Sequence, residues 1–188
     1  MASFDGHVRC LGQVRKETIA SINDKLSSCE YMWSGQETMF ATRLPNAQHI
    51  VFKFPDNYPY SHVPASYKAP WESWKELLAP IIREIVGNLG LGACETSKVM
   101  FTRLNAGAKI ATHIDENPSS RVPHKIHVPL MTHPKVIFKI EDKAYHLQVG
   151  EAYELNNLLS HSVENDSDTP RIHFIFDCFP VTGSTLNV

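Results

Sequence analysis

The sequence lacks several features that mark whole classes of protein. No stretch approaches the roughly 18 consecutive apolar residues that a membrane-spanning helix needs. Residues 1–19 contain no apolar segment of the kind found in secretory signals. Basic residues form no run, and a formal net charge of −2 provides no broad positive field for nucleic acid. We therefore expect neither a membrane span nor a nucleic-acid partner.

The cysteines lack a pattern as well. Cys10, Cys29, Cys94 and Cys178 lie far apart, and no pair has the C-x-x-C spacing of a zinc or redox motif. This spacing favours reduced thiols in a cytoplasmic protein over a disulfide scaffold. We expect all four to pack as small buried hydrophobic residues.

Length and composition fit one domain over residues 1–188. The hydrophobic share is 43% and the charged share 20%, so the chain is able to bury a sizeable core. Residues 1–95 mix helix and strand signals, whereas residues 96–180 read almost entirely as strands. We therefore expect a supporting region in the first part and a strand-built core in the second.

Two segments of the first part have the periodicity of amphipathic helices, residues 15–26 and residues 71–90. Trp71 and Trp74 are expected to pack within the second helix. Pro80 is predicted to kink or restart that helix, because proline cannot donate a backbone hydrogen bond.

The rest of the first part is predicted to hold strands and a long loop. Strands are predicted over residues 37–44 and 49–54. Residues 54–70 are rich in proline and tyrosine, which excludes a helix in practice. We expect an irregular loop there, either a lid over a binding site or a plain connector.

Eight short runs in the second part have the composition of strands and are separated by turn signals. They span residues 98–104, 108–114, 125–131, 135–140, 144–149, 151–156, 159–165 and 171–179. So many short strands predict a mainly β fold, either a sandwich or a jelly roll. Pro129 predicts an edge strand or a bulge in the third run.

Two of these runs have one apolar and one polar face. Arg171 and His173 share a face of the last run, and Lys125 and His127 share a face of the third. Such polar faces usually turn to water. A cupped sandwich that turned both faces inward would instead enclose a charged cavity.

The segment ATHIDENP (111–118) places His113 and Asp115 on one face of an extended chain. Two histidines and one carboxylate form the facial triad that binds Fe(II) and leaves coordination positions open. Chance alone gives about one His-x-acid pair in a chain of this composition. The pair is therefore weak evidence by itself, and a hydrogen-bonded pair at a strand end is the alternative.

His161 and Arg171 strengthen the metal interpretation. His161 follows after enough chain for a sheet to return beside the first pair, and the segment up to Arg171 reads as strand, polar turn and strand. We therefore expect these two residues on neighbouring strands, where a guanidinium would clamp a carboxylate near the metal. The alternative for Arg171 is a surface salt bridge with Glu164 or Asp177.

Three linked segments carry a resemblance to a known family. They are FTRLNAGAKIATHIDENPSSR (101–121), HKIHVPLMTHPKVIFKI (124–140) and HLQVGEAYELNNLLSHSVENDSDTPRIHFIFD (146–177). Together they resemble the aspartyl/asparaginyl β-hydroxylase-like family of Fe(II)/2-oxoglutarate-dependent dioxygenases, a grouping that includes free-proline hydroxylases. The resemblance covers roughly residues 98–178 and implies a double-stranded β-helix (jelly roll, cupin-like) with supporting N-terminal helices.

The resemblance implies a catalytic iron centre. His113, Asp115 and His161 match the iron ligands, and Arg171 matches the residue that pairs with the distal carboxylate of 2-oxoglutarate. We expect the second ring nitrogen of His161 to donate to a neighbouring acceptor. Animal members have glycine at the position of Asp115, and a halogenase would need that position vacant for halide. The carboxylate present here therefore favours hydroxylation.

Three further residues fall at co-substrate positions of the family. Thr102 stands where a hydroxyl residue contacts 2-oxoglutarate in animal members, and His127 belongs to the family pattern. Lys125 replaces the arginine that usually precedes x-H-x-P-L. Lysine keeps the charge but lacks the bidentate fork of arginine.

The implied activity consumes Fe(II)-bound 2-oxoglutarate and O2, releases succinate and CO2, and hydroxylates an amino acid or an Asp-, Asn- or Pro-type side chain. The alternative is a cupin-like module that binds a metal or a small acid without redox chemistry. We expect a small amino-acid or peptide substrate, with Arg103 and Arg121 as candidates to hold its carboxylate.

The remaining polar residues of this region are expected to be structural. His124, His133 and His146 are predicted to be solvated or to lie in turns. Asn156 and Asn157 are predicted to form a turn rather than to act in catalysis.

Overall fold

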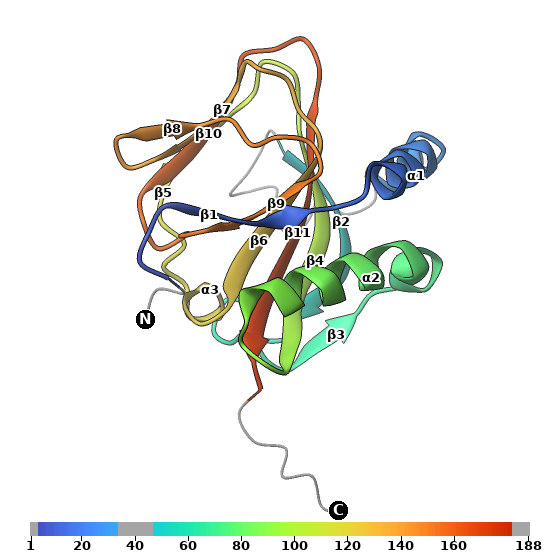
Figure 1. Ribbon diagram of the computed structural model, residues 1–188, viewed down its shortest axis with the longest axis vertical. Helices are drawn as coiled ribbons and strands as arrows, with labels where there is room; N and C mark the ends of the chain where they lie inside the picture. Colours follow the sequence, from blue (N-terminus) through green and yellow to red (C-terminus); the bar gives the residue numbers. More distant parts are fainter. Residues whose placement is uncertain (1–3, 34–46, 182–188) are drawn as a thin grey trace, which may run out of the picture.

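The computed structural model describes residues 4–33 and 47–181, and in it two antiparallel sheets face one another, with helices against the larger sheet (Figure 1). The helices are α1 (Lys16–Ser27), η1 (Glu30–Trp33), α2 (Trp71–Leu89) and α3 (Pro118–Arg121). The strands are β1 (Val8–Gln13), β2 (Ala47–Pro55), β3 (Ala65–Tyr67), β4 (Cys94–Leu104), β5 (Lys109–His113), β6 (His124–Met131), β7 (Val136–Ile140), β8 (Lys143–Tyr145), β9 (Glu151–Leu155), β10 (His161–Asn165) and β11 (Arg171–Pro180).

The sheet topology is that of a jelly roll. The larger sheet has the order β1-β9-β6-β11-β4-β2-β3, and the smaller sheet has the order β5-β10-β7-β8. From β4 onward the chain changes sheet at every connection except the one between β7 and β8. The predicted mainly β fold with N-terminal helices is confirmed.

All eight predicted runs of the second part form strands, with ends that differ by a few residues. Two strands of the first part, β1 and β3, were not predicted, because their short segments lack a clear alternation of apolar and polar residues. β1 pairs with β9 and β2 pairs with β4, so the first part contributes directly to the larger sheet. The strand predicted over 37–44 lies outside the described residues.

Pro129 lies in a bulge and not on an edge strand. β6 is flanked by β9 and β11 within the larger sheet. The register between β6 and β11 shifts where Ile172 pairs with Met131 and His173 pairs with Pro129. A bulge accommodates the missing N–H of proline inside a sheet, so one of the two predicted alternatives is confirmed.

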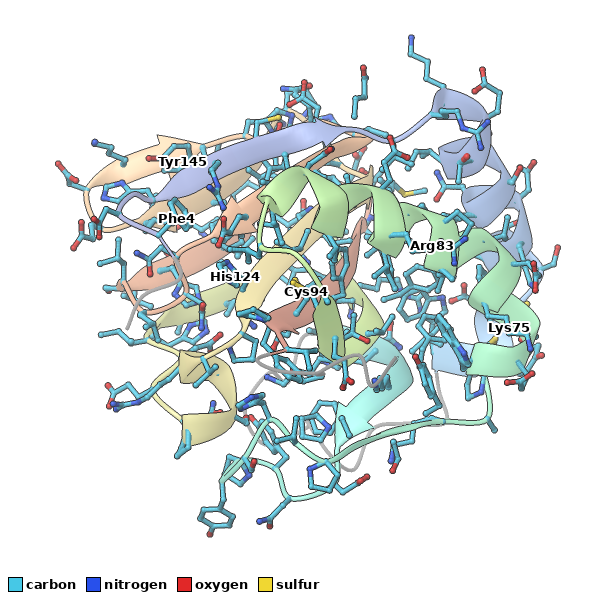
Figure 2. The ribbon with its side chains drawn as sticks, turned by 60° about the horizontal axis from the view of Figure 1, so that its bottom comes forward. Phe4, Lys75, Arg83, Cys94, His124 and Tyr145 are labelled. Atoms are coloured by element: carbon cyan, nitrogen blue, oxygen red, sulfur yellow. The ribbon has the colours of Figure 1, made fainter. Side chains whose placement is uncertain are left out.

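Both predicted helices are present and cover the larger sheet on its outer side (Figure 1). α2 continues through Pro80, which is exposed, so the helix does not restart there. Lys75 and Arg83 project from the outer side of α2 (Figure 2), while Trp74 and Leu78 are fully buried beneath it. No helix of the described residues combines the length and apolar content needed to cross a bilayer.

The main core lies between the helices and the larger sheet. The rings of Phe52, Trp74 and Phe101 are packed with centroids 4.9–5.9 Å apart, within the range of favourable aromatic contacts. Trp71 stacks on Tyr67 at the edge of this core. The two tryptophans therefore pack as predicted.

A second core closes one end of the space between the two sheets. It includes Leu104, Phe138, Ile140, Leu155 and Val163, all of which are buried. Part of this cluster also lines the space that remains between the sheets, which continues toward β6 and α3.

The four cysteines are free thiols. Cys178 is fully buried, as expected, but Cys10 is exposed because β1 is the edge strand of the larger sheet. The prediction of buried packing is therefore wrong for Cys10. Cys29 and Cys94 are half-buried.

Candidate active site

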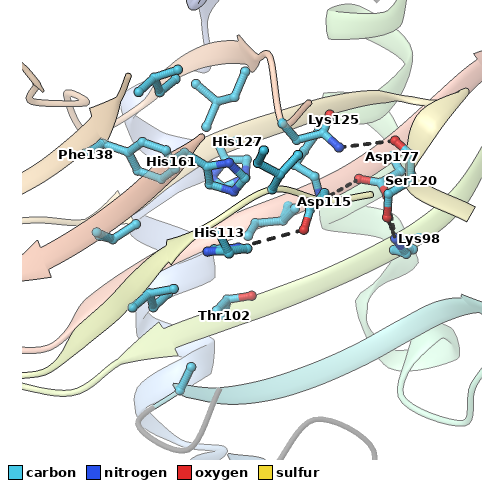
Figure 3. A pocket seen from close by; sticks show the side chains of 18 of the residues that line it. Lys98, Thr102, His113, Asp115, Ser120, Lys125, His127, Phe138, His161 and Asp177 are labelled. Carbon is cyan, nitrogen blue, oxygen red and sulfur yellow. Dashed lines mark hydrogen bonds and ion pairs between the residues drawn. The ribbon is translucent and has the colours of Figure 1, made fainter. Parts of the chain in front are cut away.

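A pocket of about 830 Å³ lies between the two sheets (Figure 3). His113 and His161 line it from the smaller sheet, and Thr102, Lys125 and His127 line it from the larger sheet. The polar faces of β6 and β11 thus turn inward, as a charged cavity requires. The pocket is large enough for a five-carbon diacid together with a small substrate.

His113, Asp115 and His161 come together at this pocket. His113 ends β5, His161 begins β10, and the two are opposite one another in the antiparallel pairing. Their ring centroids are 4.2 Å apart. Each of the three residues offers one ligand atom, and the three atoms lie within 4.8 Å of one another.

Backbone contacts fix which ring nitrogen of each histidine faces the shared point. The Nδ1 of His113 lies 2.8 Å from the carbonyl oxygen of Ala111, and the Nδ1 of His161 lies 2.8 Å from that of Leu159. A carbonyl only accepts, so each Nδ1 carries the proton and each Nε2 keeps a lone pair for a metal. Burial lowers the pKa of His161, which favours the neutral ligand form.

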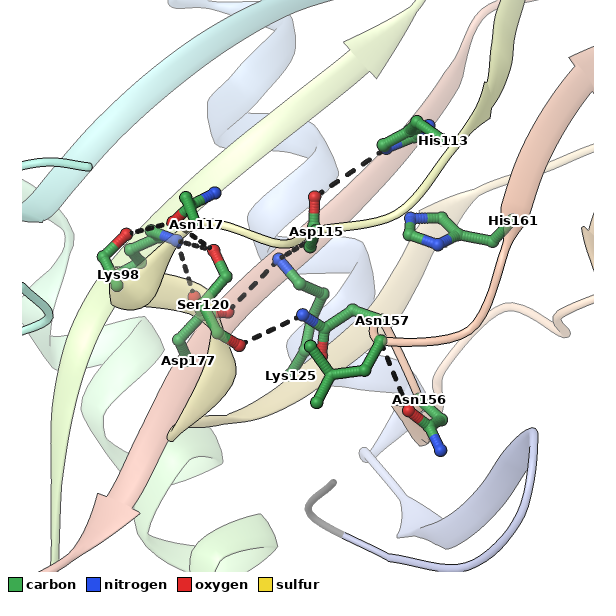
Figure 4. Close-up of polar contacts among 12 residues, drawn as sticks. Lys98, His113, Asp115, Asn117, Ser120, Lys125, Asn156, Asn157, His161 and Asp177 are labelled. Atoms are coloured by element: carbon green, nitrogen blue, oxygen red, sulfur yellow. Dashed lines mark hydrogen bonds and ion pairs between the residues drawn. The ribbon is translucent and has the colours of Figure 1, made fainter. Parts of the chain in front are cut away.

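Asp115 is held from both its backbone and its side chain (Figure 4). Its N–H donates to the carbonyl oxygen of Asn157 at 3.0 Å, which ties the segment after β5 to the turn before β10. One carboxylate oxygen, Oδ1, lies 3.8 Å from Nε2 of His113. The other, Oδ2, lies 3.2 Å from Nζ of Lys125.

The charges around Asp115 keep it ionised. Burial alone would raise the pKa of Asp115, but Lys125, His161 and Lys98 outweigh it and hold that pKa well below its usual range. Lys125 also lies 3.6 Å from Asp177. Burial would lower the pKa of Lys125, yet the two carboxylates raise it. Lys125 is thus a fixed positive charge beside this candidate metal ligand.

Arg171 is a buried cation whose hydrogen-bonding capacity is largely unused. It is 1% exposed, and its Nε and Nη1 have no hydrogen-bond partner among the described residues. Burial lowers its pKa to about 10, so the guanidinium remains charged at neutral pH. A buried charge without a partner is costly, so this arrangement favours an anionic ligand in the pocket.

The structure contradicts the alternative considered for Arg171 and also one expectation about it. It forms no surface salt bridge with Glu164 or Asp177, which pair with lysines instead. It also does not lie on a strand next to His161. β10 and β11 belong to different sheets because the polar turn between them is a crossover, and the two side chains meet the same pocket from opposite sides.

Three buried polar residues surround the Arg171 end of the pocket. Thr102 and His127 line it, as expected, together with His49, which sequence reasoning missed because β2 gives no signal beyond that of an ordinary strand. Nδ1 of His49 lies 3.3 Å from Oγ1 of Thr102. Burial, aided by Arg171, lowers the pKa of His49 to about 4 and that of His127 well below its usual value.

Arg103 lies outside the pocket. Side chains alternate along β4, so Thr102 faces the pocket and Arg103 faces away. The Arg103 guanidinium lies over the ring of Trp33 and donates to Gln48 and Glu30. The structure therefore separates Arg103 from the other candidate residues.

Arg121 also does not line the pocket. It is exposed on α3, and its Nε donates to the carbonyl oxygen of Glu116 at 2.6 Å. The same short helix nevertheless directs Ser120 into the pocket. The helix therefore borders the site, but through a residue that sequence reasoning did not select.

The remaining histidines and asparagines are mostly structural, as expected. His133 accepts a turn hydrogen bond from the N–H of Lys135, and the side chains of Asn156 and Asn157 hold the turn before β10. The prediction for His124 is wrong. It is buried, with its Nδ1 2.6 Å from Oε1 of Glu154, because β6 is an inner strand.

The family model for aspartyl/asparaginyl beta-hydroxylase matches residues 67–180, more than half of the chain. The chain belongs to this family. The match begins before residue 98, so it includes α2 and all of β4, which the resemblance in the sequence did not cover. The residues matched by the family model include strands on both sides of the pocket of this family member.

One curated relative of this family member is the L-proline cis-4-hydroxylase of Rhizobium meliloti (strain 1021), which is 31% identical over 86 residues. The aligned part is 44% of this chain and 31% of that enzyme. The chain thus spans about a third of the length of the curated relative it matches.

Solved structures share the fold of this family member at low sequence identity. A prolyl hydroxylase from Trichoplax adhaerens, in complex with a hypoxia inducible factor peptide fragment, has a TM-score of 0.62 at 10% identity over 92% of this chain and 83% of that one. The viral collagen prolyl hydroxylase of Paramecium Bursaria Chlorella virus-1, as a 2OG complex, has a TM-score of 0.58 at 9% identity over 94% and 97%. These likenesses show the jelly-roll fold.

Proposed function

We propose that this protein is an Fe(II)- and 2-oxoglutarate-dependent dioxygenase that hydroxylates an amino acid or an amino-acid side chain. The observation that carries the proposal is the buried guanidinium of Arg171, whose Nε and Nη1 find no hydrogen-bond partner in the described part of the chain, in the same pocket as the three candidate metal ligands. Membership of the hydroxylase family and the proline hydroxylase relative support the same reaction class.

The donor set fits Fe(II). Two neutral imidazole nitrogens and one carboxylate oxygen, within 4.8 Å of one another, are the ligands of a facial triad. His113 and Asp115 approach from the end of β5 and His161 from the start of β10, so all three lie on the wall formed by the smaller sheet. The side toward the larger sheet is left open for co-substrate and O2.

The residues at the Arg171 end fit 2-oxoglutarate. The guanidinium is able to donate two parallel hydrogen bonds to one carboxylate, and burial strengthens such a pair. Thr102 offers a hydroxyl beside it, and the neutral His127 adds no competing charge. We infer that these residues hold the distal carboxylate and direct the other end of the molecule toward the metal ligands.

When bound, the metal and 2-oxoglutarate supply the oxidative chemistry, in which O2 converts 2-oxoglutarate to succinate and CO2 while a substrate C–H bond is hydroxylated. The residues of the chain itself position the bound groups and neutralise their charges. Asp115 fills the third protein position, which favours hydroxylation over halide transfer. Lys125 keeps Asp115 ionised and oriented, and the apolar end of the pocket around Phe138 and Ile140 limits the entry of water.

We further propose that residues 1–188 form one dioxygenase domain, which is supported by the pairing of β1 and β2 with strands of the second part. A cytoplasmic location is proposed as well and is supported by the four free cysteines.

Succinate formation tests the proposal. Purified protein with Fe(II), 2-oxoglutarate and O2 should form succinate in the presence of free amino acids or short Asp-, Asn- or Pro-containing peptides. Arg171→Ala should abolish it, whereas Arg121→Ala, which removes an exposed arginine outside the pocket, should not. Equal succinate from the wild-type protein and Arg171→Ala would contradict the proposal and would favour a binding module without redox chemistry.

A further inference from the structure

The pocket has two charged ends. Arg171 and Asp177 both line it from β11, six residues and therefore about 20 Å apart along the strand. Lys98 pairs with Asp177 across to β4, at the end away from Arg171 and Thr102. A five-carbon diacid held by Arg171 is too short to reach this second end. The Lys98 end is thus available to a different ligand.

The second end is a built polar site (Figures 3 and 4). Lys98 is 7% exposed and Asp177 is 1% exposed. Nζ of Lys98 lies 3.0 Å from Oδ2 of Asp177 and 3.2 Å from Oγ of Ser120. Ser120 in turn donates to Oδ1 of Asn117 at 3.0 Å, and the ring of Tyr58 lies 5.5 Å from Nζ of Lys98. All five residues line the pocket.

Lys98 has hydrogen-bonding capacity left for a ligand. An ammonium group has three N–H donors. Ser120 accepts a hydrogen bond from one of them, and Asp177 forms an ion pair with the group although neither carboxylate oxygen accepts a hydrogen bond among the described residues. Asp177 already lies between two lysines, since Lys125 is 3.6 Å from its other oxygen. Lys98 therefore keeps donor capacity and a positive charge for a ligand at this end, while Asp177 is held by the charges of the two lysines.

The charge balance of the pocket with a metal and 2-oxoglutarate bound also favours an anionic group at this end. Its charged residues away from the rim are three cations and two carboxylates: Lys98, Lys125, Arg171, Asp115 and Asp177. A divalent metal and the dianion of 2-oxoglutarate cancel one another, so one positive charge stays unmatched when both are bound. Lys109 and Glu116, the other charged lining residues, are exposed. A buried, uncompensated charge is unfavourable, and a substrate carboxylate placed beside Lys98 would compensate it locally.

We propose that Lys98 binds a carboxylate of the substrate, with Asp177 and Ser120 fixing the position of the ammonium group. This assignment rests on the proposed function and gives its substrate class: an amino acid or peptide segment whose carboxylate lies at the Lys98 end. The hydroxylated carbon then lies between that carboxylate and the metal ligands. The carboxylate has two sources, the α-carboxylate of a free amino acid or an aspartate side chain in a peptide.

Matched acid and amide ligands test the assignment on the wild-type protein. Binding is measured by calorimetry without O2, with Fe(II) and 2-oxoglutarate bound. The first pair is L-proline and L-prolinamide, and the second is acetyl-Ala-Asp-Ala-amide and acetyl-Ala-Asn-Ala-amide. At least one acid should bind, and its amide should bind about tenfold more weakly or worse. The pair that responds identifies the source of the carboxylate.

Variants then assign the effect to Lys98. Lys98→Met should weaken the responding acid about tenfold or more and leave the affinity for 2-oxoglutarate unchanged, while Lys98→Arg should retain binding. Lys109→Met, which removes an exposed lysine from the rim, is the matched control. In Lys98→Met/Asp177→Asn the ion pair is removed as a whole. If Lys98 served only to neutralise Asp177, this double variant would regain wild-type affinity; we expect it to stay weak.

Three results would overturn the assignment. The first is that the amides bind as tightly as the acids. The second is that the double variant regains wild-type affinity for the acid. The third is a wild-type protein that binds 2-oxoglutarate but neither acid, a result that would leave the proposed function standing. Failure to bind 2-oxoglutarate at all would instead overturn the proposed function and this assignment with it.

Discussion

Nζ of Lys125 lies 3.2 Å from Oδ2 of Asp115, while Oδ1 of the same carboxylate lies 3.8 Å from Nε2 of His113. Oδ2 of Asp115 thus faces Lys125, while Oδ1 faces the point where the three candidate ligand atoms converge. A partner of this kind orients a metal ligand and fixes its charge state. Lys125 therefore serves the carboxylate of the candidate metal ligand.

Lys125→Met should lower the affinity for Fe(II) about 10- to 100-fold, because Asp115 loses the charge that orients it. Lys125→Arg should retain most of the affinity, since it keeps the charge within reach of Asp115. Anaerobic titration of metal-free protein with Fe(II) measures both, with Lys109→Met as the control for loss of a lysine. Wild-type affinity in Lys125→Met would show that Asp115 does not need this contact.

Arg171→Met should have opposite effects on co-substrate binding and on stability. The affinity for 2-oxoglutarate should fall about tenfold or more, because a charge-assisted hydrogen bond is lost. Without 2-oxoglutarate the free energy of unfolding should rise by about 1 kcal/mol or more, since an unpaired charge is removed from the interior. Calorimetric titration and urea unfolding measure the two effects. A variant that is less stable and binds 2-oxoglutarate normally would contradict the role of Arg171.

Stability of the metal-free protein should fall as the pH drops below about 6.5. Burial lowers the pKa of five histidines: His49, His62, His127, His161 and His173. The unfolded chain then binds more protons than the folded chain, so the free energy of unfolding decreases as pH falls from 6.5 through the lower folded pKa values, by up to about 1.4 kcal/mol per pH unit for each histidine. Above 6.5 this contribution is constant.

His173→Gln isolates one of these groups. Urea unfolding in the presence of a chelator, between pH 6.5 and 5, should show a shallower slope for this variant, by about one proton. His133→Gln, a turn histidine outside the pocket, is the control and should keep the wild-type slope. An unchanged slope in His173→Gln would mean that His173 is not the source of the pH dependence.

Pro80→Ala should stabilise the protein. Pro80 lies in the middle of α2, where it cannot donate to the carbonyl four residues earlier, and it is exposed. Proline in a helix interior costs about 3 kcal/mol relative to alanine, although part of this is regained if water solvates the free carbonyl. Thermal unfolding should show a higher midpoint for the variant. A lower midpoint would show that the ring makes a packing contact that outweighs the lost hydrogen bond.

The alternation of polar and apolar residues along a single strand could be predicted from the sequence, because it depends only on local backbone geometry. It placed Arg171, Lys125 and His127 on faces separate from the apolar core, and these faces line the pocket. The resemblance selected the three residues whose ligand atoms converge. Both inferences needed no knowledge of which strands are neighbours.

Which strands pair with one another could not be predicted from the sequence, because pairing depends on the topology of the whole fold. The short polar turn before Arg171 resembles a hairpin, yet the chain crosses there to the other sheet. Arg103 looked like a site residue by its charge alone, but the register of β4 turns it away. The sequence did not indicate a shared site of Lys98 and Asp177, because these residues come together only when β4 pairs with β11.

The central claim is that His113, Asp115, His161 and Arg171 together hold Fe(II) and 2-oxoglutarate. The most direct test is the visible absorption spectrum of the protein with Fe(II), before and after addition of 2-oxoglutarate, in the absence of O2. Chelation of the metal by 2-oxoglutarate should produce a metal-to-ligand charge-transfer band in the wild-type protein and in Arg121→Ala, but not in His113→Ala. A wild-type protein that binds both Fe(II) and 2-oxoglutarate and shows no such band would contradict the account.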